Sequence, residues 1–358
     1  MEIKKKKIQF GDLDEQIELS KTEYPDDHFI TTDKNHLSWK LLEAPYGAID
    51  ATLMFDKDQM VGRSFRQQRP FLVSHEAPPI QGATIFDVLI AEKSRNALAT
   101  LNLIKQGSDL SDVDLILHGS NEFSHPLYSK LLRYPVAFSL TLKALPLRIA
   151  NPLKKLVGFG PSFLDVLASP LHLLILLCFK LFSIFTNIQL SDDEISQENQ
   201  EIIHLEFRSI AGPHFQRDNK FFKWRYKTGP IFNAKIVGIY KKRELLGYAA
   251  LKQASFEGVK LGLVIDLQIR RELSYAERKA VTFGLVAQLV KNKTDAVAVL
   301  ANFENKLLSR MFGFPFISIP DRFLPHENPI FVLTEIKDGN PLDGLRNTYY
   351  TLADLDYF

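Results

Sequence analysis

The sequence predicts a mixed α/β protein in which one module of helices and strands occurs twice. The first observation is that the chain has only two tryptophans, each followed by a basic residue and then by a proline, in HLSWKLLEAP (36–45) and FFKWRYKTGP (221–230). The second is that residues 185 positions apart match without a gap: Asp33 and Asp218, Trp39 and Trp224, Lys40 and Arg225, Pro45 and Pro230, Lys57 and Lys242, Gly62 and Gly247, Gln68 and Gln253. The third is the length of 358 residues, which suits two domains better than one. One spacing that holds for both tryptophans indicates a duplicated unit.

Each copy is predicted to begin with a helix and a three-stranded segment. The helix around the tryptophan ends at the proline, because proline excludes the preceding residue from helical geometry. Alternating apolar residues then predict a hairpin, with charged turns at 56–58 and 241–244. A third strand follows at 82–91 or 260–269, and each carries one acid, Asp87 or Asp266, inside an apolar run.

A helix, a strand, a short helix and a last strand complete each copy. Ser274 and Glu277 have the S-x-x-E spacing of a capping box at the start of the second-copy helix. In the first copy Ser94 is the expected cap, and the expected buried face consists of Ala97, Leu98, Leu101 and Ile104. The strand that follows ends at Asn121 or Asn302, before a short helix that a proline closes.

The predicted organisation is a domain at 1–150, a hydrophobic connector at 151–199 and a domain at 200–358. The connector contains SPLHLLILLCFKLFSIF (169–185), whose apolar run is shorter than the roughly 20 residues that span a bilayer. Two interpretations stay open: packing in a core or between domains, or peripheral contact with a membrane through 165–187. The basic residues that precede the segment would suit an anionic membrane surface.

Composition and missing motifs exclude several classes of function. A formal net charge of +2 gives no basic field, so no nucleic-acid partner is expected, and Lys4 to Lys7 predict a solvated terminal arm. The single cysteine, Cys178, excludes an internal disulfide and a cysteine-based zinc site, and without an H-E-x-x-H motif no metal is expected. No apolar signal segment follows the N-terminal lysines, which predicts a cytoplasmic protein, in one interpretation peripheral at the inner face of the membrane.

Four segments together resemble a known family: LSWKLLEAPYG (37–47), FDVLIA (86–91), GSNEFSHPLYSKLLRY (119–134) and NTYYTLADLDYF (347–358). The sequence is similar to tandem proteins of the GCN5-related N-acetyltransferase superfamily, of the bacterial type found among cell-surface polysaccharide genes. The resemblance covers about 8–150 and 200–358. It implies two tandem acyl-CoA N-acyltransferase domains joined by a hydrophobic helical connector. It also implies acetyl-CoA or another acyl-CoA as donor and an amino group of a sugar or surface-polymer precursor as acceptor.

The resemblance also implies where the donor binds. In that superfamily two neighbouring strands splay apart to admit the pantetheine arm, and the next helix start receives the pyrophosphate. The gap is then expected between 86–91 and 114–120, with a phosphate loop at 92–99. The implied donor-binding residues are Leu89, Ile90, Ala91, Ser94, Arg95, Asn96, Ala97 and Asn121. Asn96 and Leu98 stand where the family has glycines, and side chains there obstruct backbone hydrogen bonds to phosphate. In the second copy Arg270 and Arg271 either hold a phosphate by charge or form a solvated basic turn.

Acyl transfer to an amine needs a base for the ammonium proton and a donor for the departing thiolate. Asp87 is the expected base. By resemblance Tyr128 is the expected donor, although counting back from Tyr134 reaches Ser129, and His125 is expected to contact the substrate. The alternative to an enzyme is a degenerate, non-catalytic binding or scaffold protein, peripheral on the membrane. An aminoacyl-tRNA donor is a third choice, disfavoured by the lack of a basic field.

Overall fold

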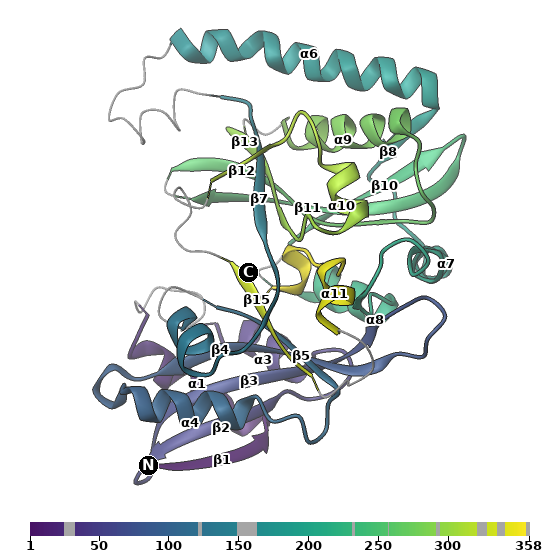
Figure 1. The fold of residues 1–358 in the computed structure, drawn as a ribbon. Helices are drawn as coiled ribbons and strands as arrows, with labels where there is room; N and C mark the ends of the chain where they lie inside the picture. Colours follow the sequence, from purple (N-terminus) through teal and green to yellow (C-terminus); the bar gives the residue numbers. More distant parts are fainter. Residues whose placement is uncertain are drawn as a thin grey trace.

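The computed structural model describes residues 1–24, 33–120, 124–148, 163–230, 233–256, 258–290, 294–320, 328–334 and 341–355. Within these residues the strands form two mixed sheets, one above the other in Figure 1. The first sheet has the order β1-β2-β3-β4-β5-β15-β6, with β9 beside β3. Its strands are β1 (Glu2–Lys7), β2 (Asp50–Asp56), β3 (Gln59–Leu72), β4 (Ile80–Ile90), β5 (Leu115–Gly119), β6 (Val136–Ser139), β9 (His214–Phe215) and β15 (Pro329–Thr334).

The second sheet has the order β14-β7-β13-β12-β11-β10-β8. Its strands are β7 (Thr141–Pro146), β8 (Ile188–Ser191), β10 (Lys235–Lys241), β11 (Glu244–Phe256), β12 (Val259–Ile269), β13 (Ala296–Ala301) and β14 (Ile317–Ser318). The predicted hairpins are present as β2–β3 and β10–β11, and the third strands as β4 and β12. In each sheet the third strand pairs in parallel with the strand that follows the helix, β4 with β5 and β12 with β13.

The two sheets exchange strands. β15, from the second half of the chain, pairs antiparallel with β5, and β7, from the first half, pairs antiparallel with β13. Figure 1 shows β7 and β15 running between the two sheets in the middle of the molecule. The predicted division into 1–150 and 200–358 did not include this exchange, by which each half completes the sheet of the other.

Helices cover the sheets and fill the space between them. They are α1 (Leu13–Lys21), α3 (Lys34–Leu42), α4 (Ala97–Gly107), α6 (Phe163–Thr186), α7 (Gln197–Phe207), α8 (Asn219–Phe222), α9 (Tyr275–Val290), α10 (Lys306–Met311) and α11 (Pro341–Arg346). Shorter turns are η1 (Phe10–Asp12), η2 (Glu92–Ser94), η3 (Leu127–Leu131), η4 (Lys223–Thr228) and η6 (Leu352–Asp354). α4 packs on β2 to β4, α9 packs on the second sheet, and α6 packs on α9. No helix in the part of the chain that the structure describes is long and apolar enough to cross a membrane.

Three local predictions are wrong. Lys4 to Lys7 belong to β1, which pairs with β2, instead of forming a solvated arm, because the alternate apolar residue Ile3 and the edge of β2 permit a strand. The cap of α4 is Asn96 and not Ser94: the Asn96 side chain accepts from the Ala99 amide at 2.9 Å. Ala97 is exposed and Leu98 is 69% exposed, so both lie off the buried face of α4, which includes Ala99, Leu103 and Ile104.

The two tryptophans bind each other at the centre of the molecule. Their rings stack with centroids 4.9 Å apart and an interplanar angle of 19°. The indole Nε1 of Trp39 donates to the Trp224 carbonyl at 3.0 Å, and that of Trp224 donates to the Trp39 carbonyl at 3.1 Å. Such a reciprocal contact is what local two-fold symmetry produces. Both rings belong to an apolar core that draws side chains from the two halves.

Candidate active site

A gap opens between β4 and β5 in the first sheet. The parallel pairing runs from Gly82 opposite Leu115 to Ile85 opposite His118 and then stops, while β4 continues to Ile90. The pairing of β4 with β3 shifts register at this point, and Asp87 has a left-handed φ of 51°. A bulge bends its strand, and aspartate tolerates this backbone region better than most residues. The bulge at Asp87 therefore turns β4 away from β5.

Strand alternation decides which backbone groups face the gap. The Ala91 amide donates to the Val61 carbonyl at 2.9 Å, and Leu89 is paired with Arg63, so both point toward β3. The backbone amide and carbonyl groups of Val88 and Ile90, which occupy the alternate positions, point toward β5. Among the expected donor-binding residues, Ile90 therefore faces the gap, whereas the backbones of Leu89 and Ala91 are used in the sheet. Val88 was missed, because the bulge that sets the alternation is not visible in the sequence pattern.

The equivalent gap in the second sheet is filled by the chain itself. Gly247 faces Ile269 as Gly62 faces Ile90, so Leu267 corresponds to Val88. The Leu267 amide donates to the Tyr349 hydroxyl at 3.1 Å, and that hydroxyl shares its one proton between the Leu267 carbonyl and Asp266 Oδ1. Beside it, Thr351 forms a bridge with Ala301 of β13, and the Asn302 amide donates to the Tyr350 carbonyl at 3.0 Å. The segment 349–351 thus occupies the place where a ligand arm would enter.

The expected phosphate loop of the first half is already bound to a carboxylate. The Glu92 amide donates to Glu23 Oε1 at 2.7 Å, and Arg95 Nη2 forms an ion pair with Glu23 Oε2. Arg95 Nη2 also donates to the Ile90 carbonyl at 3.0 Å. Ser94 ends the turn η2, Ala97 begins α4, and Asn96 caps the helix with its own side chain. Glu23 therefore holds the position that an anion would take.

A carboxylate also occupies the start of α9 in the second half. Glu277 Oε2 accepts from the Ser274 amide at 2.8 Å, and the Glu277 amide donates to Ser274 Oγ at 3.3 Å, so the predicted capping box is confirmed. Arg271 and Lys241 both pair with Glu277. Hydrogen bonds from Arg271 and then from Lys241 and Ser274 outweigh the effect of burial and hold the pKa of Glu277 far below its usual range. Arg270 pairs with Glu206 and Glu244.

Asp87 lies beside a buried guanidinium at the gap. Its Oδ2 accepts from Arg63 Nη2 at 2.8 Å, and Arg63 is fully buried. Burial alone raises the pKa of Asp87, but the charges of Arg63 and Lys40 lower it below its usual value. Arg63 also donates to the Gln16 carbonyl at 2.6 Å and to Ser20 Oγ at 2.8 Å. Asp87 is thus an ionised carboxylate at neutral pH. It can bind a cation, and it is itself a weak base.

Tyr128 and His118 form the other wall of the gap. Tyr128 lies on the π-helical turn η3 and is 2% exposed, with its ring centroid 4.3 Å from that of His118. It packs in one cluster with Phe331 of β15 and with Val88. Burial raises the pKa of the Tyr128 hydroxyl and lowers that of His118 to about 4, since both charged forms lose their hydration. At neutral pH the first is a phenol that keeps its proton and the second a neutral imidazole.

The remaining expected residues lie around this wall. His125 is half-buried, and its ring meets Phe331 edge-on with centroids 5.7 Å apart. Ser129 Oγ donates to the His125 carbonyl at 2.8 Å, so its hydroxyl serves the helical turn. Asn121 lies outside the described residues. Asp87 thus contacts Arg63 of β3, and Tyr128 packs with Val88 of β4 and with His118, a neighbour that sequence reasoning missed.

Asp266, at the position equivalent to Asp87, is bound on all sides. It accepts from Arg217 at 3.1 Å, from the Tyr226 hydroxyl at 2.6 Å and from the Tyr349 hydroxyl at 2.9 Å. Arg217 also pairs with Asp354, which in turn pairs with Arg69 of β3 at 3.2 Å. All these side chains are buried. This cluster of Arg69, Arg217, Asp266 and Asp354 ties the second sheet to the first, and Asp266 is a structural residue.

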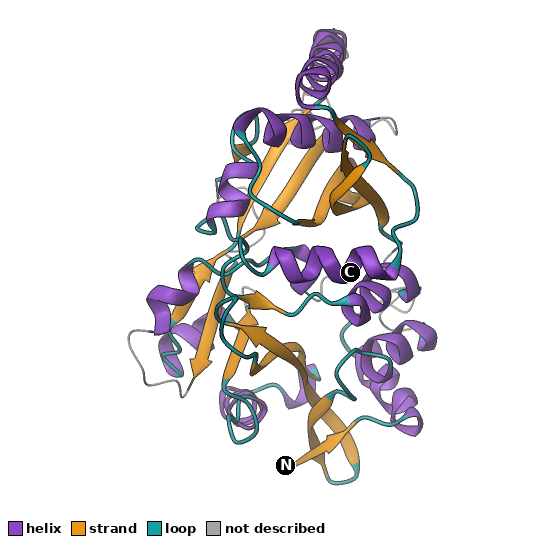
Figure 2. Cartoon of the chain, turned by 90° about the vertical axis from the view of Figure 1, so that its right-hand side faces the viewer, coloured by secondary structure: helices purple, strands orange, loops and turns teal. Residues whose placement is uncertain are grey.

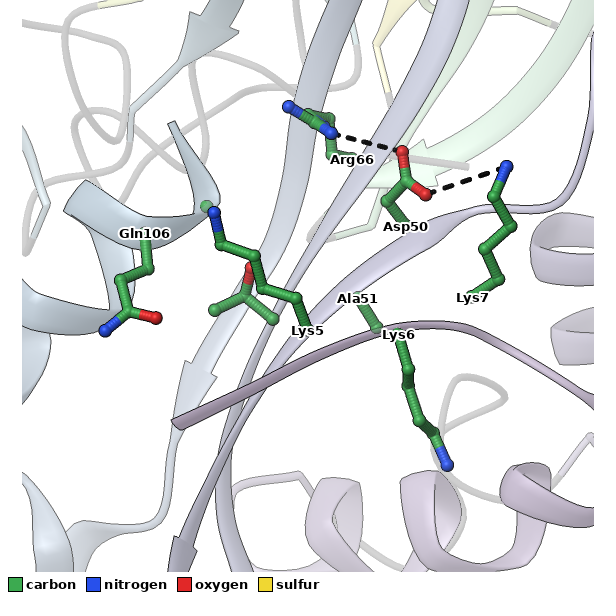
Figure 3. Close-up of a pocket in the computed structure, with 9 residues that line it drawn as sticks. Lys5, Lys6, Lys7, Asp50, Ala51, Arg66 and Gln106 are labelled. Carbon is green, nitrogen blue, oxygen red and sulfur yellow. Dashed lines mark hydrogen bonds and ion pairs between the residues drawn. The ribbon is translucent and has the colours of Figure 1, made fainter. Parts of the chain in front are cut away.

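A hollow of about 210 Å³ lies away from the gap, between β1, β2 and the end of α4. Figure 3 shows its lining, with Arg66 and Lys7 both directed at Asp50. Arg66 pairs with Asp50 at 3.2 Å and Asp112 at 2.8 Å, and Lys5 pairs with Asp109 at 2.8 Å. Its cations are thus neutralised. Across the described ranges no three His, Cys, Asp or Glu side chains come together as a metal site.

Comparisons with known proteins agree on the fold. No family model matches the sequence, and no curated protein matches it. A GCN5-related N-acetyltransferase from Anabaena variabilis is similar, with a TM-score of 0.57 and 12% identity over 92% of this chain and 72% of that one. The N-myristoyltransferase of Saccharomyces cerevisiae, solved with bound myristoyl-CoA, gives a TM-score of 0.56 and 8% identity over 93% of this chain and 79% of that one. The predicted fold class is confirmed: the chain has the mixed α/β fold of these acyltransferases.

Proposed function

We propose that the protein is a tandem acyl-CoA-dependent N-acyltransferase in which the gap between β4 and β5 binds the donor. The observation that carries the proposal is the difference between the two gaps. The gap beside Val88 has backbone groups directed into it, whereas the one beside Leu267 is closed by Tyr349. A pantetheine arm carries amide groups that pair with an exposed strand edge. The first half is therefore the active one.

The side chains around this gap supply the groups that acyl transfer needs. The acceptor ammonium binds next to the Asp87 carboxylate and loses a proton to it, directly or through a water. The amine nitrogen then attacks the thioester carbonyl carbon, the bond between carbon and sulfur breaks, and Tyr128 donates its proton to the leaving thiolate. Acid and base assistance of this kind contributes about 10²-fold or more to the rate. We assign His125 the role of a substrate contact.

We further propose acetyl-CoA or a longer acyl-CoA as donor and an amino-bearing small molecule, such as a sugar or surface-polymer precursor, as acceptor. The donor class is supported by the likeness to acyltransferases, one of which was solved with myristoyl-CoA. The acceptor class rests on the resemblance to tandem relatives. A cytoplasmic enzyme with access to precursors at the membrane fits this chemistry.

One observation favours the alternative, a non-catalytic binding or scaffold protein. Glu23 and Glu277 occupy the places where the two halves would bind a pyrophosphate. Glu277 is held by two cations and a capping box, so it is a fixed part of α9. Glu23 is held by Arg95 and by the Glu92 amide. A bound pyrophosphate can displace the Glu23 carboxylate and accept hydrogen bonds from these same donors. The first half therefore retains an anion site that the second has lost.

Amide hydrogen exchange tests the proposal with an internal control. Acetyl-CoA and longer acyl-CoAs are expected to slow exchange in a peptide that contains Val88 and Ile90. They should leave a peptide that contains Leu267 unchanged, because its gap is already filled. Ligand at about 100 times its Kd should also raise the unfolding free energy by about 2.7 kcal/mol. Protection confined to 264–269 contradicts the assignment to the first half, and no protection at millimolar ligand contradicts donor binding and favours the scaffold.

A further inference from the structure

The outward side of α6 is a largely apolar surface. Its large hydrophobic side chains are exposed by 45% to 80%: Leu173, Leu174, Leu176, Leu177, Leu181, Ile184 and Phe185. They recur at every turn and span residues 173–185, a length of about 18 Å at 1.5 Å per residue. We call this surface the outer face of α6. Single exposed leucines are ordinary, but a contiguous patch marks a contact surface.

The opposite side of α6 is already buried against the protein. Ile175 is 2% exposed, and Cys178, Phe179 and Phe182 pack on the core of the second sheet. The rings of Phe182 and Phe283 of α9 stack with centroids 6.0 Å apart. Because this side anchors the helix, α6 cannot rotate to bury the outer face within the fold. A helix that is apolar on all sides requires a second apolar environment.

Basic side chains lie on and beside the outer face. Lys180 is exposed in its middle, and the sequence has no Asp or Glu between Asp165 and Asp192. At the C-terminal end of α6, the Lys242 amide donates to the Asn187 carbonyl at 3.3 Å. Lys242 and Arg243, both exposed at the tip of the β10–β11 hairpin, therefore lie at the end of α6 that carries Phe185, its most exposed ring. An anionic surface complements this arrangement.

We propose that the outer face of α6, with Lys180, Lys242 and Arg243, docks on an anionic lipid surface. Apolar side chains at the acyl boundary with lysines and arginines at the headgroups form the pattern of an interfacial helix. α6 lies at the outer end of the molecule, beyond α9, in both Figure 1 and Figure 2, so a flat surface can reach it. Pairing with a second copy through the same face would bring the lysines of the two copies together. The proposal does not depend on the acyltransferase activity.

Vesicle flotation of the full chain tests the proposal. Vesicles of phosphatidylcholine are compared with vesicles that contain about one third phosphatidylglycerol, and binding is expected on the second kind. Leu177→Gln with Ile184→Gln should weaken that binding at least about tenfold. Lys242→Gln with Arg243→Gln should weaken it about fivefold for each cation at low salt, and high salt should abolish this difference.

Matched controls separate docking from misfolding and self-association. Leu205→Gln removes a 62% exposed leucine on α7, and it should bind vesicles like the wild type. All variants replace exposed side chains and should melt at the wild-type temperature by circular dichroism. The proposal is overturned if the wild type stays unbound on anionic vesicles. It is also overturned if light scattering shows a dimer that the α6 double variant dissociates while vesicles bind neither protein.

Discussion

Asp87 and Asp266 occupy the same place in two sheets and have different environments. Asp266 accepts hydrogen bonds from Arg217, Tyr226 and Tyr349, which leaves its carboxylate no room for a substrate. Asp87 accepts from Arg63 and lies just past the point where the pairing of β4 with β5 ends. The same residue type therefore serves as a structural link in one half and as a candidate catalytic group in the other. The side chains around each aspartate decide this difference, since both halves have an aspartate at the same place in a similar apolar strand.

Replacing Glu23 by Gln should tighten coenzyme A binding. The Glu23 carboxylate competes with a phosphate for the Glu92 amide and Arg95, and a neutral amide competes less well. We expect the Kd measured by calorimetry to fall about tenfold, which corresponds to about 1.4 kcal/mol. Glu18→Gln, on α1 shortly before Glu23 in the chain and paired with Lys21, should leave the Kd unchanged. An unaltered Kd in Glu23→Gln would place the pyrophosphate elsewhere.

Replacing Tyr128 by Phe should slow turnover without weakening substrate binding. The phenol is the proton donor assigned to the leaving thiolate, and its loss removes a contribution made in the transition state. We expect kcat to fall about 10²-fold with KM nearly constant. Tyr134→Phe, in the same aromatic cluster, serves as the control and should retain most activity. Equal loss in both variants would indicate a packing effect.

Buried histidines should make stability fall in mild acid. Burial lowers the pKa of His36, His118 and His204 to about 4 and that of His214 to about 3. Below pH 6.5 the unfolded chain takes up protons that the folded chain refuses, so stability is complete above that pH and declines as the pH falls toward 4.

His118→Leu isolates one of these contributions. The unfolding free energy, measured with urea from pH 7 to pH 4.5, should decline less steeply by up to about 1.4 kcal/mol per pH unit than in the wild type. His75→Asn alters an exposed ring and should keep the wild-type slope. A wild-type slope in His118→Leu would show that His118 is protonated in the folded protein.

At the scale of elements, the sequence predicted those features that depend on residues close together in the chain. Alternation and turn residues located the hairpins β2–β3 and β10–β11, and the S-x-x-E spacing located the start of α9. Contacts between distant segments were not predictable. Glu23 reaches Arg95 over 72 residues, and Tyr349 reaches Leu267 over 82. No periodicity in the chain encodes either contact, although both decide whether a ligand can bind.

The segment that closes the second gap should stabilise the fold. Tyr349→Phe removes a hydroxyl that accepts from the Leu267 amide and shares its one proton between the Leu267 carbonyl and Asp266. These buried groups would lose their partner, and we expect the unfolding free energy to drop by about 1 to 3 kcal/mol in urea titrations. Tyr275→Phe changes a 64% exposed tyrosine and should be neutral. A neutral Tyr349→Phe would mean that water replaces the hydroxyl, and so that the gap is open to solvent.

At the scale of the molecule, three independent links join the halves. The tryptophans bind each other's carbonyls, the cluster of Arg69, Arg217, Asp266 and Asp354 crosses between the sheets, and β7 and β15 are exchanged. The exchange also joins the candidate site to the second half, because Phe331 of β15 packs on Tyr128 and His118. The second half therefore supports the first as well as duplicating its pattern.

The last prediction follows from this exchange: neither half should fold alone. A fragment of residues 1–150 lacks β15, so β5 becomes an unpaired edge and the cluster of Phe331, Tyr128 and Ile104 loses a member. A fragment of residues 200–358 lacks β7, which leaves β13 unpaired on one side. Each fragment by itself should therefore show no cooperative thermal transition by circular dichroism. When the two fragments are mixed, a cooperative thermal transition should return. Tryptophan fluorescence should report the same midpoint, because the stacked pair of Trp39 and Trp224 forms only when both fragments are present. A cooperative transition in fragment 1–150 alone would show that the first sheet closes without the second half.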